Sequence, residues 1–424
     1  MTLTLYVILV LLIIAIAFEG MVHLDRVYQV PFGAAAVFGG FIAPPLFGLL
    51  NVDYLPEWAL ERYLFMCILC LAMIWLGDSL ARRNSPVEAE PATYDAHSWL
   101  LAATLLVLVG GAAYAKSRSL FESGMAMNEG LPVALDFAVA LLRYGFVMAL
   151  IYYLSTRNPY ALAVVGFAGL YYVDRIVFFG RRGIAISFAF IVAGAVWFVL
   201  GKRLPRAVIL AAIACATVFV FTVAAYRSVA VSTTGQRDWS RLWEVNVFEQ
   251  LRENTREGSS ETTCGIYLLA ASAEARAYDF GLYHWNRLVF NFVPAQLFGR
   301  DLKESLILPV PDPRELAQSE FGYVSKGGTT ATGMVDCYAS FWYLGCLKFL
   351  VIAYIMQRFY QRAINGGIMA QVIYLHLMGV TLETITHHTH WFVRPWVHIA
   401  CFWIPAMLYC RWRGQRAASL SLAC

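Results

Sequence analysis

The stretch DRIVFFGRRG, Asp174 to Gly183, contains Arg175, Arg181 and Arg182 and lies between two long apolar runs. A guanidinium group holds phosphate oxygens with a planar fork of N–H donors and keeps its charge at physiological pH. Three such groups at a membrane surface are suited to a lipid diphosphate. Two simpler interpretations stay open: Arg175 pairs with the neighbouring Asp174, or the arginines bind anionic lipid headgroups.

Further candidate side chains come from the second half of the chain. The run THHTHWFVRP, Thr386 to Pro395, is rich in histidine. An imidazole or a carboxylate can take up the proton of an attacking hydroxyl group, so Asp336, His387 and His390 are candidates for a catalytic base. Asp336 has an alternative role as a helix cap, and the histidines have one as interfacial residues or as metal ligands. The candidates for substrate binding are Arg287, Arg394, His284, Lys326 and Tyr338.

Motifs for nucleotide or metal chemistry are missing from the sequence. It contains no Walker loop, no GxGxxG, no HExxH and no DxD pair. This pattern argues against ATP hydrolysis, a nucleotide-sugar donor, a catalytic metal ion and any other cofactor. The net charge of +4 comes from arginines in loops, so we expect no nucleic-acid partner.

The composition is typical of a multi-pass membrane protein. Of the 424 residues, 60% are hydrophobic and 14% are charged, and many runs reach the ~20 apolar residues that cross a bilayer. These runs are continuous rather than alternating, so we expect helices and not barrel strands. Pro44 and Pro45 should kink the second span, and Glu383 in the tenth is a charged residue within the membrane, which makes it a functional candidate. The predicted fold is an all-α transmembrane bundle of about eleven spans, at residues 2–18, 30–50, 59–80, 98–116, 132–154, 159–173, 184–200, 207–226, 336–357, 367–386 and 394–410.

Lysine and arginine in short loops predict the orientation of these spans. Basic groups follow the third, seventh, ninth and last spans. All four fall on one side, the cytoplasm, if the N-terminus lies outside. The same count places DRIVFFGRRG and THHTHWFVRP outside, so the arginines of the first stretch violate the positive-inside rule. One miscounted helix would return that stretch to the cytoplasm.

Residues 227–335 form one large excursion between an N-terminal membrane part, 1–226, and a C-terminal membrane part, 336–424. Within it, LLAASAEARAYDFGL predicts a helix that ends at Gly281. HWNRLVFNFVPAQLFGRDLKESLILPVPDPRE contains prolines and a glycine that break helix, and it predicts a re-entrant or interfacial segment. A disulfide between Cys264 and Cys337 is an open alternative to two free thiols. An amphipathic helix is predicted from the apolar positions Leu242, Val245, Phe248 and Leu251.

Three stretches resemble bacterial oligosaccharide repeat-unit polymerases of the Wzy type. FFGRRG resembles their G-[ST/R]-R-G element, and NRLVFNFVPAQLFGRDLK is similar to their outer-loop segment. GGTTATGMVDCYASFWYLGCLKF resembles their T-x-x-G-x-x-[ED]-x-Y-x-x-F-G-x-x-G element, with Asp336 at the acidic position followed by Tyr338, Phe341 and Gly345. The resemblance covers residues 160–360.

The resemblance implies a GT-C-like helix bundle in the bacterial inner membrane, with a large helical loop and the active face in the periplasm. The implied enzyme is a metal-independent glycosyltransferase. It joins oligosaccharide repeat units carried on undecaprenyl diphosphate into a surface polysaccharide. Arg175, Arg181 and Arg182 would stabilise the leaving diphosphate, with Arg287 or Arg394 as a clamp. The implied partners are the lipid-linked oligosaccharide, membrane lipids, a chain-length regulator and a flippase.

The sequence departs from that family in two places, and these departures keep other functions open. Many polymerases have a single arginine where this chain has Arg181 and Arg182. The run THHTHW is not a polymerase motif, whereas the O-antigen ligases of similar architecture are thought to use an outer-loop histidine. A ligase that transfers the glycan to a lipid acceptor is therefore one alternative. A polysaccharide transporter or flippase and a structural role are the others.

Overall fold

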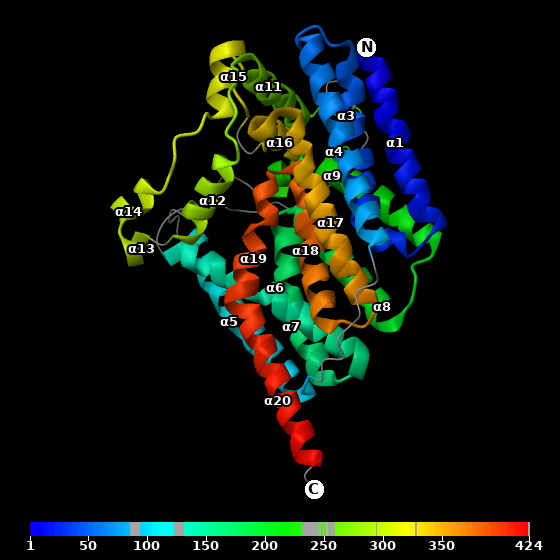
Figure 1. Ribbon diagram of the computed structural model, residues 1–424, viewed down its shortest axis with the longest axis vertical. Helices are drawn as coiled ribbons and strands as arrows, with labels where there is room; N and C mark the ends of the chain where they lie inside the picture. The colour runs from blue at the N-terminus through cyan, green and yellow to red at the C-terminus, as the bar shows by residue number, and fades with distance from the viewer. Residues whose placement is uncertain are drawn as a thin grey trace.

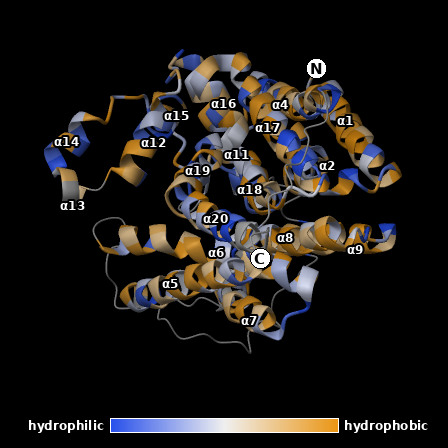
Figure 2. Ribbon diagram, turned by 60° about the horizontal axis from the view of Figure 1, so that its bottom comes forward, coloured by the Kyte–Doolittle hydropathy of each residue, from blue (hydrophilic) through white to orange (hydrophobic). Residues whose placement is uncertain are grey.

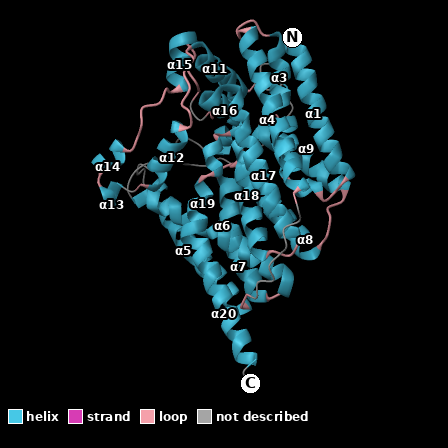
Figure 3. Cartoon of the chain, in the orientation of Figure 1, coloured by secondary structure: helices cyan, strands magenta, loops and turns pink. Residues whose placement is uncertain are grey.

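The computed structural model describes residues 1–84, 94–122, 131–230, 259–293, 295–326 and 329–422, together with residues 246, 249 and 252. Every regular element in these ranges is helical (Figure 3). The α-helices are α1 (Thr2–Val22), α2 (Val30–Val37), α3 (Ala43–Gly48), α4 (Glu57–Arg83), α5 (Ala96–Glu122), α6 (Leu131–Thr156), α7 (Pro159–Val173), α8 (Arg182–Leu200), α9 (Arg206–Ala230), α11 (Ser260–Glu274), α12 (Leu282–Phe292), α13 (Ala295–Phe298), α14 (Arg300–Ser305), α15 (Pro313–Phe321), α16 (Gly333–Phe341), α17 (Leu347–Ile364), α18 (Ile368–Thr386), α19 (Arg394–His398) and α20 (Ile404–Leu422). Short 3₁₀ or π segments are η1 (Arg26–Tyr28), η2 (Phe38–Ile42), η3 (Leu49–Asn51), η4 (Asp174–Phe178), η6 (Trp342–Cys346), η7 (Thr389–Phe392) and η8 (Ile399–Trp403).

The chain is a multi-pass membrane protein whose described elements are all helical. In the described residues, nine helical stretches are long and apolar enough to cross a bilayer, and apolar residues line much of α1, α5, α8 and α9 (Figure 2). The expected eighth and eleventh spans do not meet this criterion. In α9 the continuous stretch of described side chains is Arg206–Phe219, which is apolar but too short for this criterion, and the last expected span runs through α19, η8 and α20. The nine are Thr2–Val22, Val30–Asn51, Glu57–Arg83, Ala96–Phe121, Leu131–Thr156, Pro159–Phe178, Arg182–Leu200, Gly333–Ile364 and Ile368–Thr386.

The second span is interrupted where the proline pair predicts it. Segment η2 is a π-helical turn that ends at Ile42, and Pro44 and Pro45 follow within α3. A proline inside a helix has no N–H to donate and its ring collides with the preceding turn. The wider π turn relieves that collision, and it marks the kink in the span.

Basic residues from several loops gather at one end of the bundle. Arg26 and Arg82 both pair with Glu19 at the end of α1, and Nε of Arg206 donates to the carbonyl of Met21 at 3.0 Å. At the opposite end, beside the N-terminus, lie α11, α15 and α16 (Figure 1). There the Thr2 hydroxyl donates to the Glu57 carboxylate at 3.0 Å. The basic residues Arg26, Arg82 and Arg206 thus lie together at one end of the bundle.

The excursion after α9 folds into short helices, and one sequence prediction fails there. Helix α11 begins after the cap residue Ser259, whose hydroxyl accepts the Thr262 N–H at 3.1 Å, and it ends at Glu274. Gly281 does not end that helix, because its positive φ of 86° instead places it before the first turn of α12. The stretch expected to be re-entrant or interfacial contains helix α12, and its position relative to the membrane stays a prediction. The amphipathic helix predicted around Val245 lies outside the described residues.

The two cysteines of the proposed disulfide are free thiols and are buried. The Cys264 sulfur lies 3.8 Å from the hydroxyl of Thr329. Cys337 lies within the buried helix α16 and interacts with Cys70 of α4. Of the two alternatives that the sequence left open, the structure therefore has two free thiols, and each packs against a different neighbour.

Helices α8 and α18 pack closely through small residues. A Cβ atom added to Gly379 of α18 would collide with Ser187 of α8, and one added to Gly194 of α8 would collide with Leu375. Small residues at such positions let the backbones of spanning helices approach each other. This contact places the N-terminus of α8, with its two arginines, beside the last turns of α18.

Candidate functional site

A cavity of about 790 Å³ lies between α2, α6, α8, α9 and α18. One part of its wall is apolar and includes Val37, Ile186, Phe190, Ile213 and Phe219. The other part is charged, and in the described residues it has more cationic than anionic side chains. The charged lining residues are Arg143, Arg175, Arg181, Arg182, Arg394, Asp136, Glu261 and Glu383. The cavity therefore has the polarity of a lipid with a charged head.

The turn between α7 and α8 aims its arginines at this cavity. Helix α7 continues into η4, and the N–H of Arg181 then donates to the carbonyl of Arg175 at 3.0 Å. Gly180 closes the turn with a φ of 57°, a conformation that glycine adopts without strain. Arg181 precedes the first turn of α8 and Arg182 begins it. The positive end of the helix dipole adds to their charge, which favours an anion there.

Arg175 does not pair with its neighbour Asp174, so that alternative is wrong. The Asp174 carboxylate accepts hydrogen bonds from Arg118 and from the hydroxyl of Tyr114. The Arg175 guanidinium instead lies 5.0 Å from the ring centres of both Tyr114 and Phe179. Its Nε is buried and has no hydrogen-bond partner. Aromatic rings thus hold this cation in place while its Nε stays without a hydrogen-bond partner.

Two of the other arginines in the cavity are already paired with acids. Arg182 donates to Glu261 of α11 at 2.9 Å and also lies over the ring of Phe41. Arg394 donates to Asp136 of α6 at 2.8 Å. Arg181, by contrast, is exposed and forms no ion pair with any described residue. Among the predicted arginines of this cavity, Arg175 and Arg181 are therefore the two that form no ion pair with a described acid and are available to an anionic ligand.

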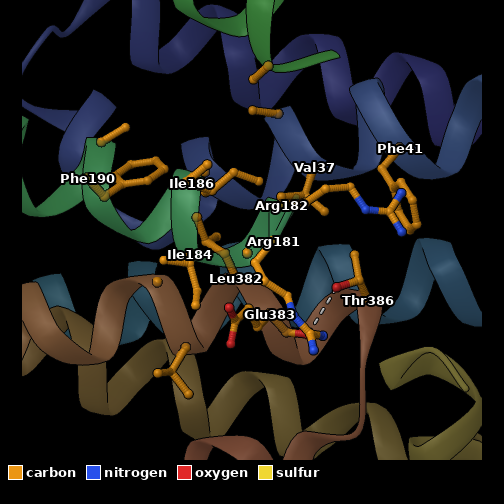
Figure 4. Close-up of a pocket in the computed structure, with 18 of the residues that line it drawn as sticks. Val37, Phe41, Arg181, Arg182, Ile184, Ile186, Phe190, Leu382, Glu383 and Thr386 are labelled. Carbon is orange, nitrogen blue, oxygen red and sulfur yellow. Dashed lines mark hydrogen bonds between the residues drawn. The ribbon is translucent and has the colours of Figure 1, made fainter. Parts of the chain in front are cut away.

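Glu383 lies in the same part of the cavity as Arg181 (Figure 4). It comes from the end of α18, and its charge interacts with that of Arg143 from α6. A Cβ atom on Gly183 would collide with its carboxylate oxygen Oε1. The last glycine of GRRG therefore leaves room for this carboxylate.

Arg143 was not singled out from the sequence. It lies inside the predicted span 132–154, where a charged residue is unusual enough to mark a functional site. Its Nε is buried and has no hydrogen-bond partner in the described structure. The general rule for charges within a membrane, applied to each span in turn, would have found it.

Asp336 is the centre of a separate polar cluster, with Thr389, Lys348, His284 and His388. Its carboxylate accepts hydrogen bonds from the Thr389 N–H at 2.9 Å and from the Thr389 hydroxyl. The Lys348 ammonium and ring nitrogens of both histidines lie 3.6 Å from its oxygens. Only 2% of the Asp336 side chain is exposed. The cluster joins α12, α16, α17 and the loop after α18.

The three predicted histidines do not share one site. His387 lines the arginine cavity and its Nδ1 lies 2.9 Å from the hydroxyl of Thr386. His284 and His390 lie together in the Asp336 cluster, with ring centres 6.1 Å apart. Burial lowers the pKa of His284 and of His387 to about 4, and that of His390 to about 3. All three imidazoles are therefore neutral near pH 7.

Three predicted binding residues lie outside the arginine cavity. Arg287 of α12 is exposed and donates to the hydroxyl of Tyr283 at 2.8 Å, beside the Asp336 cluster. Lys326 is exposed, and its carbonyl accepts the Thr329 hydroxyl at 2.7 Å. Tyr338 is 1% exposed and packs against other tyrosine rings. The structure thus brings together Arg175, Arg181, Arg182, His387 and Arg394 in the cavity, and Asp336, His284 and His390 in the cluster.

A second groove, of about 830 Å³, runs from the Asp336 cluster along α17. His284, Lys348 and Thr389 lie at one end, and Leu347, Val351 and further apolar residues form the rest. Since α17 is part of a membrane-spanning stretch, the apolar part of this groove lies at the depth of the lipid chains.

No set of three or more His, Cys, Asp or Glu side chains in the described part of the chain is arranged to hold a metal ion. Comparisons with protein-family models, with curated proteins and with solved structures found no match to this chain.

Proposed function

We propose that this protein is a glycosyltransferase that polymerises oligosaccharide repeat units carried on undecaprenyl diphosphate. The observation that carries the proposal is the two-part wall of the arginine cavity. At one end Arg175 and Arg181 are available to phosphate oxygens, and apolar residues of α2, α8 and α9 line the remainder. A polyprenyl diphosphate has the same division into an anionic head and a long apolar tail.

The proposed location is the bacterial inner membrane, with the charged part of the cavity facing the periplasm. The distribution of basic residues supports this orientation. Arg26, Arg82 and Arg206 lie at the opposite end of the bundle from α11 and α16. Basic loops are retained in the cytoplasm, so the end with Arg182 and its partner Glu261 would be periplasmic.

The chemistry of the proposed reaction needs no nucleotide, because the diphosphate bond already carries the energy for glycosyl transfer. A hydroxyl group of one lipid-linked repeat unit attacks the anomeric carbon of the other glycan. The bond from that carbon to the diphosphate oxygen breaks, and undecaprenyl diphosphate leaves. Arg175 and Arg181 stabilise the negative charge that develops on the leaving group. Removing one such preorganised donor typically costs ~10²–10³ in rate.

A ligase that transfers the glycan to a lipid acceptor is the second candidate function. His387 favours it, because this histidine lies in the same cavity as the arginines. The donor half of the reaction would be the same, and the two functions differ only in the acceptor.

Substitution of Arg181 tests the proposed function in a strain that lacks the native gene. We expect Arg181→Ala to reduce the surface glycan to single repeat units at an unchanged protein level. Lys202→Ala is the control, since Lys202 is exposed in the loop between α8 and α9 at the opposite end. Loss of even the single repeat would indicate a transporter instead. Long chains that are no longer attached to their acceptor would indicate a ligase, and glycan of normal length would refute the role of Arg181.

A further inference from the structure

The polymerase proposed above needs a group that takes the proton from the attacking hydroxyl, and the cavity contains three carboxylates in the described residues. Asp136 and Glu261 are each held by an arginine, at 2.8 and 2.9 Å. Glu383 forms no hydrogen bond with an arginine in the described structure, although its charge interacts with that of Arg143. It is therefore the one carboxylate in the described wall of the cavity whose oxygens are not engaged by an ion pair at hydrogen-bond distance.

The position of Glu383 is set by close contact with the GRRG turn. Its Oε1 lies where the Cβ of any residue other than glycine at position 183 would be. Position 183 follows directly after Arg181 and Arg182, so the carboxylate lies beside the backbone that carries both arginines (Figure 4). A diphosphate held by Arg181 would have its sugar next to this carboxylate.

The other candidates for the base are less suited to the task. The carboxylate oxygens of Asp336 are already engaged by Thr389 and Lys348. In the described structure Asp336 also lines neither the arginine cavity nor the groove along α17. His390 belongs to the Asp336 cluster. His387 does line the cavity, but its Nδ1 is engaged by Thr386. Glu383 combines access to the cavity with free lone pairs, which a proton acceptor requires.

We propose that Glu383 is the catalytic base of this site and that Gly183 and Arg143 position it. This inference rests on the proposed function. In the step, the acceptor hydroxyl gives its proton to a carboxylate oxygen of Glu383 while its oxygen bonds to the anomeric carbon. The bond between that carbon and the phosphate oxygen breaks, and its electron pair leaves with the diphosphate. Arg143 balances the charge of Glu383 before the proton arrives.

The test compares Glu383→Gln with the wild-type protein, purified and reconstituted into nanodiscs. The amide has the shape of the carboxylate but does not act as a base at neutral pH. We expect polymerisation to fall by about 10²–10⁴-fold, while binding of undecaprenyl diphosphate stays within about twofold. The pH–rate profile of the wild type should decline on its acid side, and the residual rate of Glu383→Gln should lack that decline.

Several results would overturn the role of Glu383. They are polymerisation by Glu383→Gln near the wild-type rate, loss of undecaprenyl diphosphate binding together with the rate, and an acid decline that persists in the variant. The first result together with an inactive Arg181→Ala would leave the proposed function standing. Normal polymerisation by both variants would refute the roles of Glu383 and Arg181, whereas no polymerisation by the wild-type protein would refute the proposed function itself.

A second variant tests the positioning without removing the carboxylate. Gly183→Ala places a methyl group against the flexible end of Glu383, so the chain should still fold while the carboxylate is displaced. We expect its polymerisation rate to fall at least tenfold with binding of undecaprenyl diphosphate retained. Gly169→Ala in α7 is the matched control, because no atom lies within 4 Å of an added Cβ there. An unchanged rate in Gly183→Ala would contradict the proposed positioning.

Discussion

The arginine cavity and the groove along α17 are nearly equal in size, at about 790 and 830 Å³. They differ in whether their charged side chains already have partners. In the cavity, Arg175 and Arg181 form no ion pair with a described acid, although Glu383 lies in the same part of the cavity as Arg181. Beside the groove, the Asp336 carboxylate accepts hydrogen bonds from Thr389 and lies 3.6 Å from the Lys348 ammonium. The comparison shows that volume alone does not identify a ligand-binding site. Unpaired cations can bind an anionic ligand, whereas a cluster whose charges are already paired has no such capacity left.

The largest expected effect concerns the stability of the Asp336 cluster. Asp336→Ala removes the acceptor of the Thr389 donors and leaves the Lys348 ammonium without its acid. Breaking a buried charge pair in this way costs about 3–5 kcal/mol, so we expect a much lower midpoint for loss of monodisperse protein on heating. Adding Lys348→Met should recover part of the loss because both charges are then gone. The exposed residue Asp301 provides the control variant Asp301→Ala, and equal midpoints for Asp336→Ala and Asp301→Ala would contradict a structural cluster.

The next effect is on turnover and belongs to the arginine cavity. Arg175→Ala should reduce the polymerisation rate by about 10²–10³-fold, as expected for one lost donor to the leaving group. Arg175→Lys should not restore the rate, because an ammonium has no planar fork and stacks less well on Tyr114 and Phe179. Arg203→Ala is the matched control, since Arg203 lies over the ring of Trp197 at 5.3 Å in the opposite loop. A fully active Arg175→Ala would show that Arg175 has only a structural role, through its contact with Tyr114 and Phe179.

The last effect is absent near neutral pH: it is on stability in acid and arises mainly at the cluster. In the folded protein burial lowers the pKa of His284 to about 4 and that of His390 to about 3, whereas in the unfolded chain both lie near ~6.5. Between these values only the unfolded chain takes up the protons. Stability is therefore complete above about pH 6.5 and is lost as pH falls toward 4, by up to roughly 1.4 kcal/mol per pH unit for each histidine.

His390→Gln provides the measurement for that effect. Its thermal midpoint should depend less on pH between about 6.5 and 4 than that of the wild-type protein, because one of the depressed imidazoles is gone. Parallel pH curves for the two proteins would mean that His390 is accessible to protons in the folded state.

Sequence reasoning succeeded for the arginines because their positions are decided locally. One short segment between two spans carries Arg175, Arg181 and Arg182. These three residues therefore stay close together wherever that segment lies in the fold. The apolar runs likewise predicted most of the membrane-spanning helices. Their lengths follow from the thickness of the bilayer, and nine of the expected runs are spanning helices in the described structure.

The partners of these residues could not be predicted in the same way, because they depend on contacts between distant elements. Asp336 meets Thr389 across 53 residues of chain, and no local pattern reveals that its oxygens are occupied. The adjacent residues His387 and His388 face different regions, one the arginine cavity and the other the Asp336 cluster. Gly281 has the residue type of a helix end, but its role as the start of α12 is decided by the turn that precedes it.

The close packing of α8 against α18 has a consequence for how the site responds to its surroundings. At Gly379 there is no space for a methyl group opposite Ser187, so the main chains themselves act as the spacer between the two helices. Side chains can change rotamer when the bilayer thins or the temperature rises, but the main chain of a helix is stiff. The separation between the start of α8 and the end of α18 should thus stay constant across membranes of different lipid content.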